Sequence, residues 1–302
     1  MNNEPIWAIE FYKLYEDRNI EQLRSSLFKV SDVLIYLNEI LTEHNVKLAD
    51  KEVYSEQLII KFYLQNLSLI TLSKGIEIKS NYHKNNFSKI KFLDISSILT
   101  IVRSQYETLL MYQHIYVNSK IENQQKLRFD SWIMSSMILR SKIFSETQNN
   151  NQSRLLEEKN AIENLREIIK NNPEFQFLTE KQKVKLLEVG SGKLFKSWEN
   201  LFYESNFTED GVFSKIYYIA SVYAHSEGIS ALQLKNSKHL MDDENMREIK
   251  YIMLYYSYLM TNIMIKNIVN KFPIIKERFD TLEERLKFEV NFNYQLSFKK
   301  SK

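Results

Sequence analysis

Apolar residues recur at intervals of three and four along most of this chain, and no stretch sustains the alternation of apolar and polar residues that marks a strand. Such spacing matches the 3.6-residue turn of an α-helix. It is clearest between residues 20 and 44, where six aliphatic residues follow it: Leu23, Leu27, Val30, Leu34, Leu37 and Leu41. The pattern predicts an all-α fold, a multi-helix bundle of long antiparallel helices.

Residues that begin or end helices divide the chain into elements. Asn19, Asp94 and Thr179 can cap helix N-termini through side-chain oxygens, and Gly75 and Gly190 suit the position just past a C-terminus. With these boundaries the sequence predicts helices at 5–17, 20–44, 50–74, 95–119, 121–146, 155–170, 180–189, 197–204, 212–228, 243–271 and 277–290. The tail that follows is expected to be frayed.

The domain organisation predicted is one helical domain over residues 1–302. Its core is expected at about 20–271, followed by a C-terminal helix and tail at 274–302. The polar stretch 147–153 has no helical periodicity and is the best internal linker. Polar motifs that appear to need each other lie on opposite sides of it. Helices on both sides are therefore expected to share one core.

The composition mainly excludes certain classes of protein and of functional site. Hydrophobic residues make up 44% and charged residues 26% of the chain, with a formal charge of +3, which is ordinary for a folded domain and excludes disordered classes. The absence of cysteine excludes disulfides, thiol nucleophiles and Cys-ligated metals. The stretch 190–193, GSGK, lacks the first glycine and the following Ser/Thr of a phosphate loop. No metal and no cofactor are expected.

The sequence also bears on location. Its start has neither the basic nor the apolar region of a signal peptide. The longest uncharged apolar-rich run, residues 251–265, is shorter than the roughly 20 residues of a membrane-spanning helix. A cytoplasmic protein without a membrane partner is expected.

Between residues 74 and 91 the helical pattern breaks into a basic segment that carries Tyr82 and Phe87. Basic groups interleaved with aromatic rings can bind an anionic nucleic-acid strand. A solvated loop has the same composition, so both interpretations stay open.

The helix predicted at 95–119 carries charged groups on a mostly apolar face. Arg103 and Glu107 lie one turn apart on it, so they can pair, and His114 follows on the same stripe. As a buried structural pair, Arg103 and Glu107 would contribute little net stability, yet Arg103→Ala would cost on the order of 3–5 kcal/mol. As a functional pair, they could hold an anion and orient a general base.

A second polar stripe lies on the aromatic segment 212–228. Tyr218, Ser221 and His225 share it. The candidate catalytic residues are Arg103, Glu107 and His225, which together supply an anion-binding guanidinium, an orienting carboxylate and an acid or base near neutral pH. The candidate binding residues are Ser221, Tyr218, Tyr223 and His114. For His114, a satisfied core histidine is the competing interpretation.

Two motifs carry a resemblance to known proteins, R-S-x-x-E at 103–107 and S-x-Y-A-H-S at 221–226. They resemble an uncharacterised bacterial helical-domain family distantly grouped with HEPN-like bundles. The resemblance implies that the Arg/Glu helix and the His helix pack together. HEPN ribonucleases place His shortly after Arg on one helix, a pattern that none of the five histidines here follows. A ribonuclease site would have to join Arg103 to His225.

Two functional hypotheses follow. The first is a non-catalytic or regulatory helical component of a bacterial intracellular system, such as anti-phage defence, that acts through self-association or a protein partner. The Met- and Tyr-rich helix 244–271 motivates it, because exposed apolar faces mark interfaces. The alternative is a HEPN-like ribonuclease or nucleotide-binding enzyme, with RNA or a nucleotide as its ligand.

Overall fold

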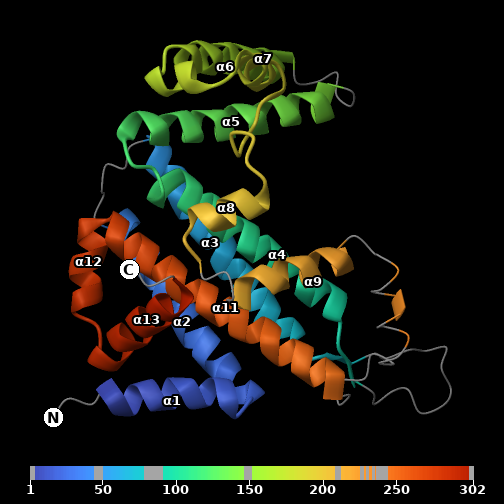
Figure 1. Ribbon diagram of the computed structural model, residues 1–302, viewed down its shortest axis with the longest axis vertical. Helices are drawn as coiled ribbons and strands as arrows, with labels where there is room; N and C mark the ends of the chain where they lie inside the picture. The colour runs from blue at the N-terminus through green and yellow to red at the C-terminus, as the bar shows by residue number, and fades with distance from the viewer. Residues whose placement is uncertain are drawn as a thin grey trace. The chain divides into compact units, whose positions relative to one another are not determined.

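The computed structural model describes residues 4–43, 50–77, 91–145, 152–207, 212–224, 228, 231–232, 235 and 244–298. These residues are almost entirely helical, which confirms the predicted all-α bundle (Figure 1). The long helices are α1 (Glu4–Glu16), α2 (Ile20–Glu43), α3 (Asp50–Leu72), α4 (Ile95–Tyr112), α5 (Glu122–Ser145), α6 (Gln152–Lys170), α9 (Val212–Ala224), α11 (Glu244–Lys271) and α13 (Glu284–Ser297). The shorter helices are α7 (Glu180–Val189), α8 (Trp198–Glu204) and α12 (Pro273–Asp280).

Four minor elements, two strands and two short turns, join the helices of the described part. Strands β1 (Ile76–Glu77) and β2 (Lys91–Phe92) pair antiparallel, with Ile76 opposite Phe92. A π-helical turn, Gln113–Val117, follows α4 directly, and a 3₁₀ turn, Pro173–Phe177, follows α6. Most of the basic segment 74–91 lies outside the described residues, so its two interpretations stay predictions.

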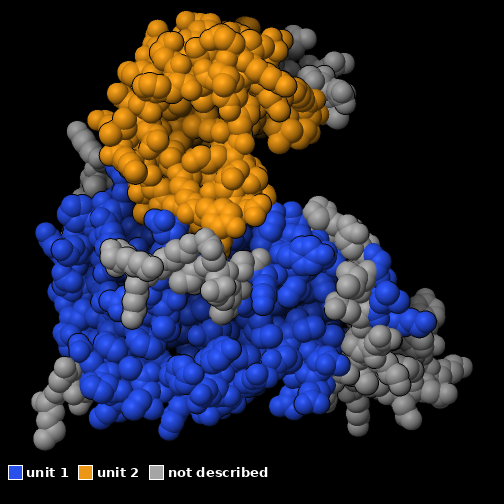
Figure 2. All heavy atoms as spheres, viewed as in Figure 1, with its two compact units in different colours: residues 1–109, 206–302 blue, residues 110–205 orange. Residues whose placement is uncertain are grey.

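The chain divides into two compact units (Figure 2). Unit 1 contains residues 1–109 and 206–302, and unit 2 contains the continuous stretch 110–205 between them. The unit boundaries therefore fall within α4 and after α8, whereas the expected linker at 147–153 lies inside unit 2. Of that linker, residues 147–151 lie outside the described part and the last two belong to α6. A single domain stays a prediction.

Helix α11 is the central element of unit 1 and packs against α2, α3, α12 and α13. Large apolar side chains surround it, which is the pattern of a helix buried on all sides. Met260, Ile263 and Met264 are fully buried in it. The Met- and Tyr-rich face that suggested an interface is therefore largely core.

Buried amides and hydroxyls join four helices of unit 1. The Asn66 amide of α3 donates to the hydroxyls of Ser31 on α2 (2.9 Å) and Thr261 on α11 (3.0 Å). The Gln105 amide of α4 donates to the Asn66 side-chain oxygen (2.5 Å), which also lies 2.8 Å from the Ser257 hydroxyl of α11. All five residues, the amide network, are 0% exposed. Because burial of unpaired polar groups is costly, this network favours one register of the helices.

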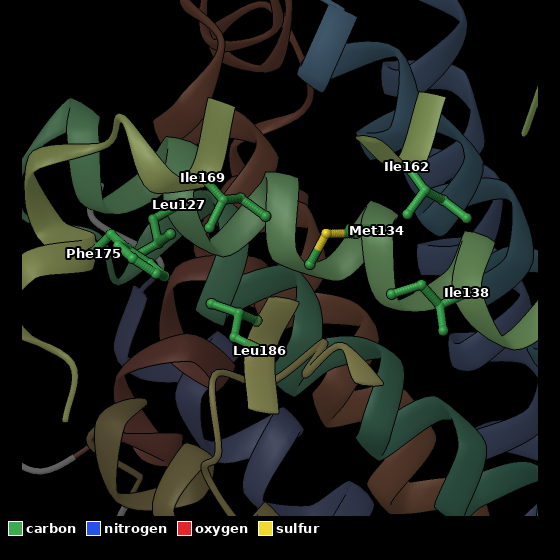
Figure 3. Packing of buried hydrophobic residues seen from close by; sticks show 7 residues of the cluster. All are labelled: Leu127, Met134, Ile138, Ile162, Ile169, Phe175 and Leu186. Carbon is green, nitrogen blue, oxygen red and sulfur yellow. The ribbon is translucent and has the colours of Figure 1, made fainter. Parts of the chain in front are cut away.

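Unit 2 has its own hydrophobic core (Figure 3). It contains side chains from α5, α6, the 3₁₀ turn and α7: Leu127, Met134, Ile138, Ile162, Ile169, Phe175 and Leu186. Helices α5 and α6 flank residues 147–151, so elements on the two sides of that stretch share this core.

Several helix boundaries match their sequence signals. The side chains of Asn19 and Asp94 accept from the backbone N–H groups of Gln22 and Ser97, each at 3.1 Å. Thr179 forms the predicted capping box at the start of α7. Gly190 follows α7 with φ of 82°. A Cβ there would lie 2.8 Å from the Ser135 Cα atom, so a side chain would collide with α5.

The C-terminal region differs from the prediction. Instead of one helix at 277–290 and a frayed tail, the structure has α12, α13 and an isolated bridge between Phe298 and Phe207. Helix α13 extends to Ser297 because its aromatic residues pack against α1. Phe288 lies 5.7 Å from the Trp7 ring, and Phe292 lies 6.2 Å from the Phe11 ring. These partners are distant in sequence, so no local pattern marked them.

Candidate functional site

The first candidate site begins with the ion pair on α4 in unit 1. The Arg103 Nε atom donates to the Glu107 Oε1 atom at 3.0 Å. The side chains are 19% and 28% exposed, so the pair lies at the edge of the apolar face rather than within it. The charge of Glu107 raises the pKa of Arg103 against the opposing effect of burial. The guanidinium is therefore a permanent cation with its partner fixed.

A tyrosine of α9 completes this pair. The Tyr217 hydroxyl donates to the Glu107 Oε1 atom at 3.3 Å, and the Arg103 Cζ atom lies 5.4 Å from the Tyr217 ring centre. Burial and the Glu107 charge raise the pKa of Tyr217, so it is a neutral donor. The predicted Tyr218 is 73% exposed and points elsewhere. One residue along a helix turns the side chain by about 100°, which separates Tyr217 from Tyr218.

Of the other predicted residues of α9, Ser221 contacts Tyr217, where a side-chain hydrogen bond from it lowers the Tyr217 pKa against the effect of burial. The Ser221 hydroxyl donates to the Tyr217 backbone carbonyl of its own helix at 2.6 Å. Tyr223 is 5% exposed, and burial raises its pKa. His225 lies outside the described residues, so its place in a catalytic site stays a prediction.

The second candidate site surrounds His114 in unit 2. His114 lies in the π-helical turn Gln113–Val117, and its side chain is fully buried. Its Nδ1 atom lies 2.9 Å from the Glu204 Oε2 atom of α8. Single π-helical turns in α-helices are frequent at functional sites. The sequence singled out His114 but did not indicate this turn or the carboxylate beside it.

Glu204 also contacts two cationic side chains. Its Oε1 atom lies 2.5 Å from the Arg128 Nη2 atom of α5, and its Oε2 atom lies 2.9 Å from the Lys196 Nζ atom. Arg128 also donates from Nη1 to the His114 backbone carbonyl at 2.7 Å. The four residues His114, Arg128, Lys196 and Glu204 form the Glu204 network. It joins α5, α8, the π-helical turn and the connection before α8.

The network fixes the charges of its members. Burial alone would raise the pKa of Glu204, but the hydrogen bonds from His114 and Lys196 and the charge of Arg128 lower it to about 2. Burial lowers the pKa of His114, and the charges of Arg128 and Lys196 add to this effect against the attraction of Glu204. At neutral pH, His114 is therefore a neutral imidazole beside an ionised carboxylate.

This arrangement defines the proton position on His114. A carboxylate only accepts, so the Nδ1 atom carries the hydrogen and the Nε2 atom keeps its lone pair. The Nε2 atom is buried and has no hydrogen-bond partner among the described residues. A neutral imidazole backed by a carboxylate can accept a proton at this atom. Because the atom is enclosed, a substrate could reach it only after the surrounding turn moved.

Glu204, Arg128 and Lys196 were missed by the sequence-based prediction. His114 and Glu204 are 90 positions apart. A single carboxylate on a short helix gives no local sign of its partner. The only signal was indirect: Arg128 lies between the apolar residues Leu127 and Phe129 of a predicted helix, and Arg103 likewise lies on the mostly apolar face of its own helix.

Comparisons with known proteins give no match to a family model, to a curated protein or to a solved structure. In the described part of the chain, no group of three or more His, Cys, Asp or Glu side chains could hold a metal ion. None of the helices seen there has the length and hydropathy required to cross a membrane.

Proposed function

We propose that this protein is a non-catalytic helical component that works through association, and that a hollow between α3 and α4 in unit 1 is the contact surface. The hollow has a volume of about 760 Å³. Its described lining comes from both helices and contains Leu64, Leu67, Ser68, Thr71, Leu72, Ser96, Ser97, Thr100 and Ile101. None of these lining residues is charged.

Three of the five hydroxyl groups in the described lining of the hollow already donate hydrogen bonds within their own helices. Ser68 and Thr71 donate to the carbonyls of Leu64 and Leu67 at 2.9 and 2.8 Å, and Thr100 donates to the Ser96 carbonyl at 2.8 Å. These three hydroxyls therefore serve their own helices. The surface offers methyl and methylene groups to a partner, which favours apolar side chains over a polar ligand.

The occupant that this surface fits is a second copy of the chain. Leu64 lines the hollow and is 54% exposed, so the same surface carries an apolar projection and the space for one. A twofold contact requires this self-complementarity, because each copy presents the same patch. A stable dimer buries more surface than one hollow, so the hollow would be its centre. We propose further that the protein acts in a bacterial defence system, which the family resemblance suggests. We also propose that it is cytoplasmic, which its sequence suggests.

Light scattering on the full chain at increasing concentration tests the proposal. Wild type should approach the mass of a dimer, and Leu64→Lys should weaken dimerisation at least about a hundredfold, since two leucines lose their burial. Val184→Lys is a matched control, because Val184 is 52% exposed on α7 in unit 2. A wild-type monomer at every concentration, or equal effects of the two variants, would refute it.

A second candidate function is acid–base catalysis on a phosphate ester, such as RNA or a nucleotide. The unpartnered Nε2 atom of His114, with Arg128 and Lys196 nearby, favours it. In His114→Asn the side-chain nitrogen can still donate to Glu204, but the base is lost. Hydrolysis by wild type and not by this variant would support catalysis. Absence of hydrolysis in both would leave His114 a structural residue.

A further inference from the structure

A second cavity in unit 1 has a different character from the hollow between α3 and α4. Its volume is about 220 Å³, and residues from α1, α9, α11 and α13 line it. Its walls are mainly aromatic: Phe11, Tyr12, Tyr15, Phe213, Tyr255 and Phe292. An aromatic lining presents flat apolar faces, which suit a planar ring.

Contacts beside the cavity fix the positions of the helices that form its walls. Tyr15 of α1 packs against Tyr255 of α11 with ring centres 5.2 Å apart. The Tyr251 hydroxyl donates to the Leu14 backbone carbonyl at 2.9 Å, which fixes the end of α1 to α11. On the other side, Phe11 and Phe292 lie 6.2 Å apart. Because α1 is fixed on both sides, the cavity is part of the packed structure.

Two polar residues of the cavity lining, Asn293 and Ser297, are buried, and the Ser297 hydroxyl donates to the Asn293 backbone carbonyl at 2.9 Å. Asn293 is 2% exposed, and its side-chain nitrogen donates to the Glu289 backbone carbonyl and to the Tyr258 hydroxyl, each at 3.0 Å. A backbone carbonyl only accepts, so this contact fixes which end of the amide is the nitrogen. The Asn293 side-chain oxygen accepts no hydrogen bond from the described residues. This oxygen therefore has its accepting capacity unused among the described residues.

We propose that this cavity binds a planar aromatic molecule of one or two fused rings that carries one N–H or O–H donor. The size supports this class, because an engineered apolar cavity of about 150 Å³ holds benzene, and this cavity is larger. The aromatic walls would stack on the ring, and the Asn293 oxygen would accept the single hydrogen bond. The site is separate from the association surface, so neither proposal depends on the other.

Calorimetric titration of the full chain with indole tests the proposal. Indole should bind, and benzothiophene, which has the same shape without the N–H group, should bind about tenfold more weakly, the worth of one hydrogen bond. Equal affinities would overturn the role of Asn293. No binding of indole would overturn the site.

Two variants locate the binding. Leu296 lines the cavity at its exposed edge, so Leu296→Trp should fill the opening and abolish indole binding. Leu139→Trp is the control, because Leu139 lies on α5 in unit 2 and is 60% exposed, close to the 54% of Leu296. This variant should bind indole as wild type does. Equal thermal unfolding of the two variants would show that Leu296→Trp acts on the site rather than on folding. Retained binding in Leu296→Trp would contradict the proposed place.

Discussion

Each unit holds a buried polar network, and the two networks are built in opposite ways. In unit 1, the amide network of Ser31, Asn66, Gln105, Ser257 and Thr261 is neutral, and its members satisfy one another. In unit 2, the Glu204 network places one carboxylate against two cations and an imidazole. Both arrangements select one packing of the helices. Only the charged one carries a large desolvation cost and depends on protonation.

Removal of Glu204 should have the largest effect. Glu204→Ala leaves the Arg128 guanidinium, 5% exposed, without its carboxylate, and an unpaired buried charge costs about 3–5 kcal/mol. Denaturant unfolding followed by hydrogen exchange in α5 and α6 measures this loss. Glu167→Ala is the control, because its pair with Lys170 is exposed at the surface. A loss below about 1 kcal/mol for Glu204→Ala, the range of surface pairs, would mean that the network is not a structural centre.

The neutral network should be less sensitive. Asn66→Ala removes the partner of Gln105 and of three hydroxyls, and stranded buried groups cost about 1–3 kcal/mol. We expect a loss of about 2 kcal/mol, read from hydrogen exchange in α2 and α11. Ser68→Ala should change almost nothing, because its hydroxyl donates only to its own helix. If Asn66→Ala exceeded Glu204→Ala in cost, the contrast between the units would be reversed.

Acidification should change the stability of the two units in opposite directions. The pKa of His114 is lowered by burial, so its contribution to stability is present above the unfolded value of 6.5 and is lost as pH falls toward the folded pKa. In unit 1, burial raises the pKa of Glu289, so stability there increases as pH falls toward the unfolded value of 4.5.

Hydrogen exchange at pH 7 and pH 5, corrected for the intrinsic exchange rate, measures both slopes. Amides of α5 and α6 should lose protection, while those of α11 and α13 should keep or gain it. The variant His114→Asn should remove the loss in unit 2. Equal loss in both units would show that acid acts through some other group.

The smallest loss of stability is expected at the ion pair of Arg103 and Glu107. This pair tests whether charge or burial determines the free-energy cost of breaking an ion pair. Because both side chains are partly exposed, Arg103→Met should cost about 1 kcal/mol, less than the 3–5 kcal/mol expected for a buried pair. Adding Glu107→Leu should recover most of it. Denaturant unfolding of the single and double variants measures the coupling. A single-variant cost near that of Glu204→Ala would contradict the role assigned to burial.

Much of the fold could be predicted because its signals are local. The periodicity of α2, the capping box at Thr179 and the glycine after α7 each depend on residues within a few positions. The boundary between the units could not be read in this way. It falls within the continuous helix α4, whereas the polar stretch 147–153 that resembled a linker connects two helices of one unit.

The candidate site was predictable only in part. The Arg103 and Glu107 pair follows from their spacing on one helix. Tyr217 and Tyr218 both lie in an aromatic segment without a clear apolar stripe, so the sequence could not indicate which one faces α4. The partner of His114 depends on how α8 packs, and that is a property of the fold.

Cross-linking through introduced cysteines tests the proposed association most directly, because the chain has no cysteine of its own. Leu64→Cys and Thr100→Cys, each made in the full chain, place one thiol on the projection and one in the hollow. With a short bis-maleimide, a mixture of the two proteins should give cross-linked dimers in high yield. Leu64→Cys mixed with Val184→Cys should give few. Equal yields in the two mixtures would contradict a twofold contact through α3 and α4.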